Sequence, residues 1–133
     1  PPAEATPAVA APPQKITKRY WLVTEQKERG ATQFDIDLYV NAKWVKRFKN
    51  DDEQVVMEIT KHLVPGKNKL LFAATKNLAE PRKSESPGTF YRVVIGEGDV
   101  NAGNVMIDLP LIDLKRTAAE GENVTEEREL VAR

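Results

Sequence analysis

The sequence predicts an all-β protein, an antiparallel β-sandwich that follows a Pro/Ala-rich N-terminal tail. About eight short segments rich in aromatic and β-branched residues follow one another, separated by clusters of Gly, Pro, Asn and charged residues. This is the spacing of strands in an antiparallel sandwich. In the clearest segment, residues 32–40, apolar and polar residues alternate strictly, as in a strand of a sheet that has one face on a core and the other in water.

The composition fits one domain with a tail and disfavours several classes of function. The chain has 133 residues, of which 20 are basic and 20 acidic, so its formal net charge is zero. A nucleic-acid-binding protein usually carries a basic surplus, so we expect no nucleic-acid partner. Cysteine is absent, which excludes disulfides, thiolate nucleophiles and Cys-based zinc sites. No apolar run approaches the roughly 20 residues that cross a bilayer, so no direct membrane insertion is expected.

The tail, residues 1–14, consists almost entirely of Pro and Ala. Proline removes hydrogen-bond donors, and alanine supplies too little apolar area to pack, so we expect an extended, disordered spacer. Such a spacer often tethers a β-domain to a membrane anchor or a neighbouring domain, which favours a periplasmic or cell-surface location. A plain disordered terminus explains the same composition.

The β-sandwich domain is expected over residues 15–133, with its strands set by period-2 alternation. The expected strands cover 16–24, 32–40, 43–49, 54–59, 69–75, 89–95, 105–114 and 124–131. Their apolar positions predict a core of Phe34, Ile36, Leu38, Val40, Met57, Ile59, Leu70, Phe72, Ile107 and Leu109.

The connections between these strands carry recognisable turn chemistry. Asn41-Ala42 stands where a two-residue hairpin turn belongs, although Ala suits its positive φ less than Gly does. Residues 60–64 form a short connection with room for one helical turn. Pro65-Gly66 predicts a type II turn. Pro110 marks an edge strand, a bulge or a division within the run 105–114.

Two long segments are expected to be exposed loops and the strongest candidates for partner binding. The first, 76–88, carries Arg82 and Lys83 side by side between two prolines that limit its freedom. The second, 96–103, is rich in glycine and carries Glu97, Asp99 and Asn101. Oxygen ligands on a flexible loop can hold Ca²⁺, but their spacing does not match an EF-hand, so no metal is assigned.

Three short sequence motifs within residues 34–72 follow one another in the order found in a known protein family. They are LYVNAKWV over 38–45, EIT over 58–60, and the set Leu63, Pro65-Gly66-Lys67-Asn68 and Leu70. This order resembles the galactose-binding-like fold, whose best-known members are sugar-binding accessory domains of glycoside hydrolases. Ala42 stands where that family usually has Gly. The resemblance implies a jelly-roll-like sandwich, and as a function it implies carbohydrate binding.

Aromatic residues are the side chains that a sugar-binding site would need. Tyr39 lies opposite the core face of its expected strand, and Trp44 follows the hairpin turn. Either ring could stack on a sugar, and burial of Trp44 in the core is an equal alternative. The nearby carboxylates Asp35 and Asp37 share the solvent face of their strand, where a solubility role is the expectation.

No catalytic signature is present in the sequence. His62 is the only histidine, and the chain contains no G-x-S-x-G elbow and no phosphate-binding Gly-Lys-Ser/Thr loop. We therefore expect no enzyme and no cofactor. The primary hypothesis is a non-catalytic interaction module that binds a protein partner or a neighbouring domain in an envelope-associated assembly. The alternative is a carbohydrate-binding module.

Overall fold

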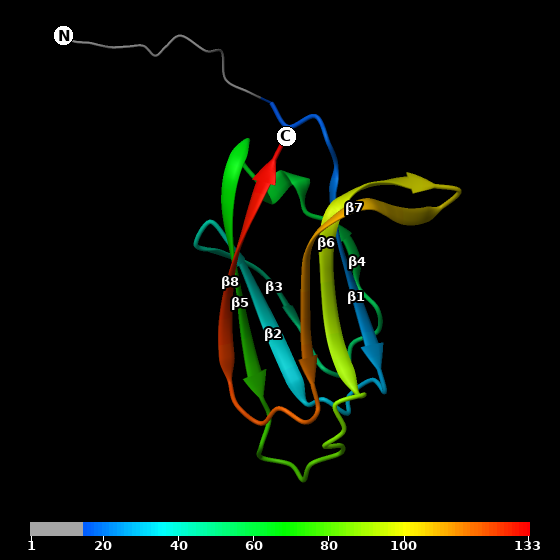
Figure 1. The fold of residues 1–133 in the computed structure, drawn as a ribbon, viewed down its shortest axis with the longest axis vertical. Coiled ribbons are helices and arrows are strands. Elements are labelled where there is room, and N and C mark those ends of the chain that lie inside the picture. Colours follow the sequence, from blue (N-terminus) through cyan, green and yellow to red (C-terminus); the bar gives the residue numbers. More distant parts are fainter. Residues whose placement is uncertain (1–14) are drawn as a thin grey trace, which may run out of the picture.

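Two four-stranded antiparallel sheets pack face to face in the computed structural model, which describes residues 15–133 (Figure 1). The described residues contain no α-helix; one turn of 3-10 helix, Thr60–His62, occupies the connection where a helical turn was expected. The all-β sandwich predicted from the sequence is confirmed. The prediction for the tail, residues 1–14, lies outside the described residues.

The strands follow the predicted order, with boundaries that shift by several residues in places. They are β1 (Tyr20–Lys27), β2 (Phe34–Val40), β3 (Lys43–Phe48), β4 (Val56–Glu58), β5 (Gly66–Lys76), β6 (Phe90–Asn101), β7 (Asn104–Thr117) and β8 (Val124–Ala132). One sheet has the order β4-β1-β6-β7, and the other has the order β3-β2-β5-β8.

The core lies between the two sheets, because each strand turns alternate residues inward. Phe34, Ile36, Leu38 and Val40 of β2 are fully buried, as their alternation predicted. Ile59, Leu70 and Phe72 are buried too, and Met57 packs half-buried against the same cluster. Two residues of the predicted core were wrong: Ile107 is only half-buried, and Leu109 is 43% exposed.

The pairing of β7 with β6 shows why these two residues lie outside the core. The register shifts between Ile95 and Gly96 and again between Glu97 and Gly98, and each shift places one extra residue on β7. Ile107 lies opposite Gly98 and Leu109 opposite Glu97, both beyond the last core pair, Ile95 with Ile112. The buried apolar residues of β7 are Ile112 and Leu114. Pro110 lies on this edge strand, beside the first shift.

Glycine is required where β7 crosses β6 at these shifts. A Cβ added at Gly96 would overlap the carbonyl oxygen of Leu109, and a Cβ added at Gly98 would overlap that of Met106. Both obstacles are backbone atoms, which cannot swing aside as a flexible side chain can. The Gly-Glu-Gly sequence therefore builds a close strand crossing, and the expected loop over 96–103 is wrong: its residues continue β6 into a tight hairpin turn.

Positive backbone φ angles occur at the predicted turns. Asn41 (φ 50°) and Ala42 (φ 71°) both adopt the left-handed region, as a type I′ hairpin turn requires. Gly66 has φ 88°, in agreement with the turn predicted at Pro65-Gly66. Ala102 (φ 53°) and Gly103 (φ 82°) form the corresponding turn between β6 and β7.

Candidate interaction surfaces

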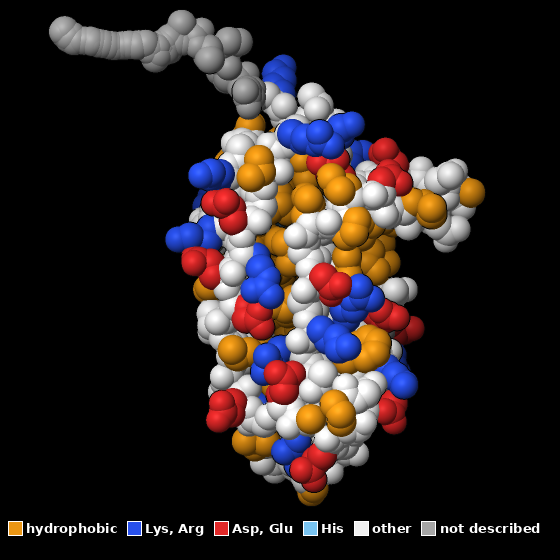
Figure 2. Space-filling model, in the orientation of Figure 1, with side chains coloured by type: hydrophobic (Ala, Val, Ile, Leu, Met, Phe, Trp, Pro, Cys, Tyr) orange, Lys and Arg blue, Asp and Glu red, His pale blue; other side chains and the backbone are white. Residues whose placement is uncertain are grey.

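The outer part of the β6–β7 hairpin, residues 98–107, projects sideways from the sandwich and is called the arm (Figure 1, drawn in yellow). Its side chains include Val100, 46% exposed, and Met106, 54% exposed; Leu109 and Leu111 are exposed just beyond it on β7. These are four of the nine exposed large apolar side chains in residues 15–133. Hydrophobic side chains are seen on the arm and directly beneath it (Figure 2).

The base of the arm is fixed to the body by Trp21 and Arg19. The indole Nε1 of Trp21 donates a hydrogen bond to the carbonyl oxygen of Gly98 over 3.0 Å, and the ring is buried. The guanidinium of Arg19 lies 4.8 Å from the centre of this ring. Arg19 also pairs with Glu58 at 2.9 Å and lies 3.8 Å from Asp99 on the arm. The arm therefore leaves the sheet in a defined direction.

Glu97 belongs to a polar network that joins the two sheets at the same end. Its carboxylate accepts hydrogen bonds from Nε and Nη2 of Arg133, at 2.8 and 3.1 Å. The hydroxyl of Tyr20 accepts the backbone N–H of Arg133 and donates to Glu97. The hydrogen bonds from Arg133 hold the pKa of Glu97 below its ordinary value, against the opposing effect of burial. Glu97 therefore has a structural partner.

The expected cluster of oxygen ligands over 96–103 does not form, because an extended strand spaces Glu97, Asp99 and Asn101 along its length, about 6–7 Å from one to the next. Glu97 turns inward, Asp99 is exposed beside Arg19, and Asn101 lies opposite Asn104 at the tip of the arm. Beside these residues lies a hollow of about 400 Å³, lined by the base of the arm together with Thr17, Lys18 and Arg133. Among residues 15–133, no three His, Cys, Asp or Glu side chains are grouped so that they could hold a metal ion.

The second expected binding segment, 76–88, is an ordered loop held to the body by Gln33. The amide Nε2 of Gln33 donates to the carbonyl oxygens of Asn77 and Pro81, and its Oε1 accepts the backbone N–H of Lys83. Arg82 Nη2 donates to the carbonyl oxygen of Ala118. Arg82 and Lys83 are both exposed, but the guanidinium of Arg82 is engaged within the fold.

Tyr39 and Trp44 are directly opposite each other across β2 and β3, on the outer face of their sheet. Trp44 is 58% exposed and Tyr39 is half-buried, so neither ring belongs to the core. The indole Nε1 of Trp44 donates to Oδ1 of Asp37 over 3.0 Å, which fixes the orientation of the ring. This places both predicted stacking rings on one accessible surface.

Asp37 has a different role from the solvated one expected. Its side chain is largely buried, and Arg47 donates to both of its oxygens at 3.1 to 3.3 Å. Burial disfavours the charged carboxylate, but the hydrogen bonds from Arg47 and Trp44 outweigh that effect and lower the pKa of Asp37. Asp35 accepts two hydrogen bonds from Asn50, so it too is engaged within the fold.

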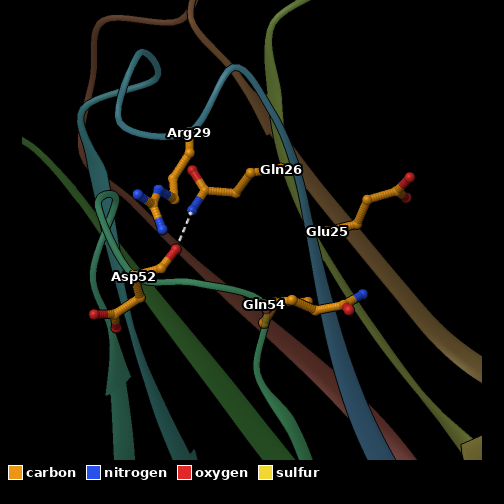
Figure 3. A pocket seen from close by; sticks show the side chains of 6 residues that line it. Glu25, Gln26, Arg29, Asp52 and Gln54 are labelled. Atoms are coloured by element: carbon orange, nitrogen blue, oxygen red, sulfur yellow. Dashed lines mark hydrogen bonds between the residues drawn. The ribbon is translucent and has the colours of Figure 1, made fainter. Parts of the chain in front are cut away.

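A small hollow of about 190 Å³ lies at the opposite end of the sandwich from the arm (Figures 1 and 3). Arg29 and Gln26 point toward Asp52, while Glu25 points away from them, across β1 (Figure 3). Gln26 donates to the backbone carbonyl oxygen of Asp52 over 3.2 Å. The hollow brings together no nucleophile and base, so it offers no support for a reaction.

The sequence analysis missed the exposed apolar side chains on β7. Leu109 and Leu111 flank Pro110, and they follow the alternation that predicts a core strand. The signal that could have placed them outside the core was Gly96-Glu97-Gly98, since paired glycines in a strand mark a close backbone approach. Trp21, the other tryptophan, lies buried against the base of the arm.

Comparisons with known proteins provide no further assignment: no family model, no curated protein and no solved structure matches this chain. Within the described residues, no helix has the length and apolar character needed to cross a membrane.

Proposed function

We propose that the protein is a non-catalytic β-sandwich module that binds another protein or a neighbouring domain, with the arm as its principal contact. The observation that carries this proposal is the group of exposed apolar side chains on and beside the arm: Val100, Met106, Leu109 and Leu111. Val100 and Met106 lie on opposite faces of the arm, since Val100 pairs with Val105 and Met106 with Asp99. Exposed apolar side chains gathered on one projecting element are characteristic of an interaction surface, because water contacts them unfavourably until a partner covers them.

The fixed base of the arm supports the same proposal. The hydrogen bond from Trp21 to Gly98 and the pair between Arg19 and Asp99 hold the hairpin in place before a partner arrives. A surface that is already ordered loses less conformational entropy on binding. Methionine at the exposed position 106 adapts to irregular partner surfaces, as it does at other binding faces.

A capture experiment with matched variants tests this proposal. The immobilised protein is compared with a Val100→Ser, Met106→Ser double variant and with the control Val131→Ser, which changes an equally exposed apolar residue on the other sheet. We expect a partner that the wild type and the control retain and the double variant loses. Identical binding by all three proteins would place the interface elsewhere.

Carbohydrate binding is a second candidate function, favoured by the arrangement around Trp44. An exposed indole with its N–H bound to Asp37 is a pre-oriented apolar platform beside Tyr39, and Arg47 supplies a charged hydrogen-bond donor. Aromatic faces of this kind stack on apolar faces of sugar rings. Titration with neutral oligosaccharides should perturb Trp44 fluorescence, and Trp44→Ala should abolish binding. No binding across glucans, xylans and mannans would exclude this candidate.

The envelope-associated location and the absence of catalysis remain predictions from the sequence. Localisation of the tagged protein in cells tests the first, and hydrolase assays on the purified protein test the second.

A further inference from the structure

Strand β8 forms an edge of the β3-β2-β5-β8 sheet, and it lies at the margin of the sandwich (Figure 1). All nine of its residues pair with β5 without a register shift, from Ala132 opposite Gly66 to Val124 opposite Ala74. On the other side of β8, no backbone hydrogen bond from elsewhere in residues 15–133 reaches this strand. Because peptide groups along a strand point alternately to its two sides, about half of the N–H and C=O groups of β8 face solvent.

The other three sheet edges have shapes that disfavour the addition of a strand. Strand β4 has only three residues, and β7 carries two register shifts and Pro110. Strand β3 has six residues, and its pairing with β2 skips Val45. Short strands, bulges and proline are the features by which natural sheets prevent edge-to-edge pairing. Among the four edges, β8 alone is both long and regular.

The edge at β8 is protected by charged side chains instead of by its shape. Glu127 and Glu129 are exposed on its outer face, and Lys69 of β5 lies opposite Glu129 and contacts Glu127 at 3.2 Å. Among residues 15–133, Glu129 has no ion pair of its own. On the inner face, Glu126 contacts Arg128 at 2.7 Å. The outer face of β8 therefore has two carboxylates beside a single ammonium group, and one of them has no cationic partner.

Protection by charge excludes some strands and admits others, whereas a bulge or a proline excludes all of them. An uncharged apolar strand added to β8 would remove water from Glu127 and Glu129 and supply no new partner. A second copy of β8 would add three glutamates and one arginine to a strand of the same composition, so like net charges would meet. A strand with Lys or Arg opposite the two outer glutamates would instead form favourable cross-strand ion pairs.

We propose that β8 is a second binding site of this protein, which accepts an extended basic segment of another protein as a fifth strand of the β3-β2-β5-β8 sheet. Hydrogen bonds between the two backbones supply the affinity, and Lys or Arg side chains at alternate positions of the added strand contact Glu127 and Glu129. The site lies on a different sheet from the arm, and it stands independently of the function proposed for the arm.

Titration of the isotope-labelled protein with synthetic peptides, followed by NMR, tests the site. The probe is an eight-residue peptide of alternating lysine and valine with both ends blocked. A second peptide carries the same charge but has proline in place of its two central valines, so it cannot form a continuous ladder. We expect only the first peptide to bind. Its binding should slow hydrogen exchange at alternate amides of β8 and leave the amides of β3, the other edge of this sheet, unchanged.

Charge reversal tests which side chains select the partner. The double variant Glu127→Lys, Glu129→Lys should weaken binding of the lysine peptide by at least about tenfold and should bind a peptide of alternating glutamate and valine instead. The matched control Glu80→Lys, Glu85→Lys makes the same change in total charge on the exposed 76–88 loop and should bind like the wild type. Circular dichroism and thermal melts confirm that both variants are folded.

Three results would overturn the site: no binding of the lysine peptide at millimolar concentration, equal binding of the proline-containing peptide, or protection of amides outside β8. Sedimentation equilibrium of the protein alone adds a fourth, since a dimer with protected β8 amides would show that a second copy occupies this edge. The Val100→Ser, Met106→Ser variant should bind the lysine peptide like the wild type, so failure of this test leaves the proposal for the arm untouched. Val131→Ser keeps the backbone of β8 and both outer glutamates, so it remains a control for the arm.

Discussion

The two segments that the sequence marked as binding loops, 76–88 and 96–103, have opposite structures. The first is an irregular loop whose backbone is bound to the body by Gln33 and Arg82. The second is a regular hairpin that extends beyond the core and exposes Val100 and neighbouring apolar residues. Both contain charged residues and residues that interrupt regular structure, proline in the first and glycine in the second, so the sequence made them look alike, whereas their hydrogen-bond partners make them different.

This difference shows which kind of exposed segment is available for binding. Polar atoms of the 76–88 loop already have partners within the chain, and a new partner would have to replace them. The arm satisfies its backbone by pairing β6 with β7, and its apolar side chains remain in water. An exposed apolar side chain on a backbone that is already satisfied gains most from contact with a partner.

The strongest test of the comparison is Gln33→Ala, which should release the 76–88 loop and leave the arm unchanged. The substitution removes three hydrogen bonds, and the Gln33 side chain is buried. Loss of such bonds at a buried site costs about 2–3 kcal/mol of unfolding free energy. Hydrogen exchange should accelerate in the loop and stay constant in residues 98–107. Unchanged protection of the loop would show that other contacts hold it.

The reciprocal test is Gly98→Ala, which should disturb the arm and leave the loop unchanged. The added Cβ would overlap the carbonyl oxygen of Met106, so the two strands would have to separate locally. We expect a loss of about 1–3 kcal/mol in stability, as for overpacked sites. Gly88→Ala is the matched control in the loop, where the nearest atom lies at 3.4 Å on a serine side chain. Equal losses in urea denaturation of both variants would contradict this account.

The two segments also show which structural features could be predicted from the sequence and which could not. Strict alternation placed Phe34 to Val40 correctly and put Tyr39 on the outer face, because period 2 holds wherever a strand is regular. It failed at Ile107 and Leu109, because the apolar alternation continues along β7 past the last buried pair, Ile95 with Ile112, where two register shifts interrupt the pairing. The bonds of Gln33 and Glu97 join residues far apart in sequence, and no local pattern encodes them.

A smaller effect is expected at the network that joins the base of the arm to β8. Glu97→Gln removes the charge that pairs with Arg133 and should cost about 1–2 kcal/mol at neutral pH. The folded-state pKa of Glu97 lies below the ordinary value of 4.5, so ionisation stabilises the fold above that pH. This stabilisation is lost as the pH falls through the folded-state pKa. The difference in stability between wild type and variant should therefore shrink in acid.

Denaturation at several pH values measures this change, and Glu129→Gln on the exposed side of β8 provides the control. The control should lower stability by no more than about 0.5 kcal/mol at neutral pH. A Glu97→Gln deficit that stays constant from neutral pH to well below 4.5 would mean that the ionised pair with Arg133 contributes nothing to the fold.

The smallest effect separates the two hairpin turns, Asn41-Ala42 and Ala102-Gly103, which share one backbone geometry but differ in both residues. Ala42 is the second central residue of the β2–β3 turn, with φ 71°, and Gly103 holds the same place in the arm, with φ 82°. An L-residue with a Cβ is strained at positive φ, whereas glycine is not. Ala42→Gly should therefore stabilise the protein by about 0.5–1 kcal/mol, after the greater chain entropy of glycine is subtracted. Gly103→Ala should destabilise the arm by a similar amount. Because no atom lies within 4 Å of the added Cβ, the effect contains no contribution from a steric clash. Thermal melts that show Ala42→Gly to be destabilising would contradict this account. Strain at Ala42 would then contribute less to stability than chain entropy does, in a turn that Asn41 already holds by hydrogen bonds to Asn68 and Lys69.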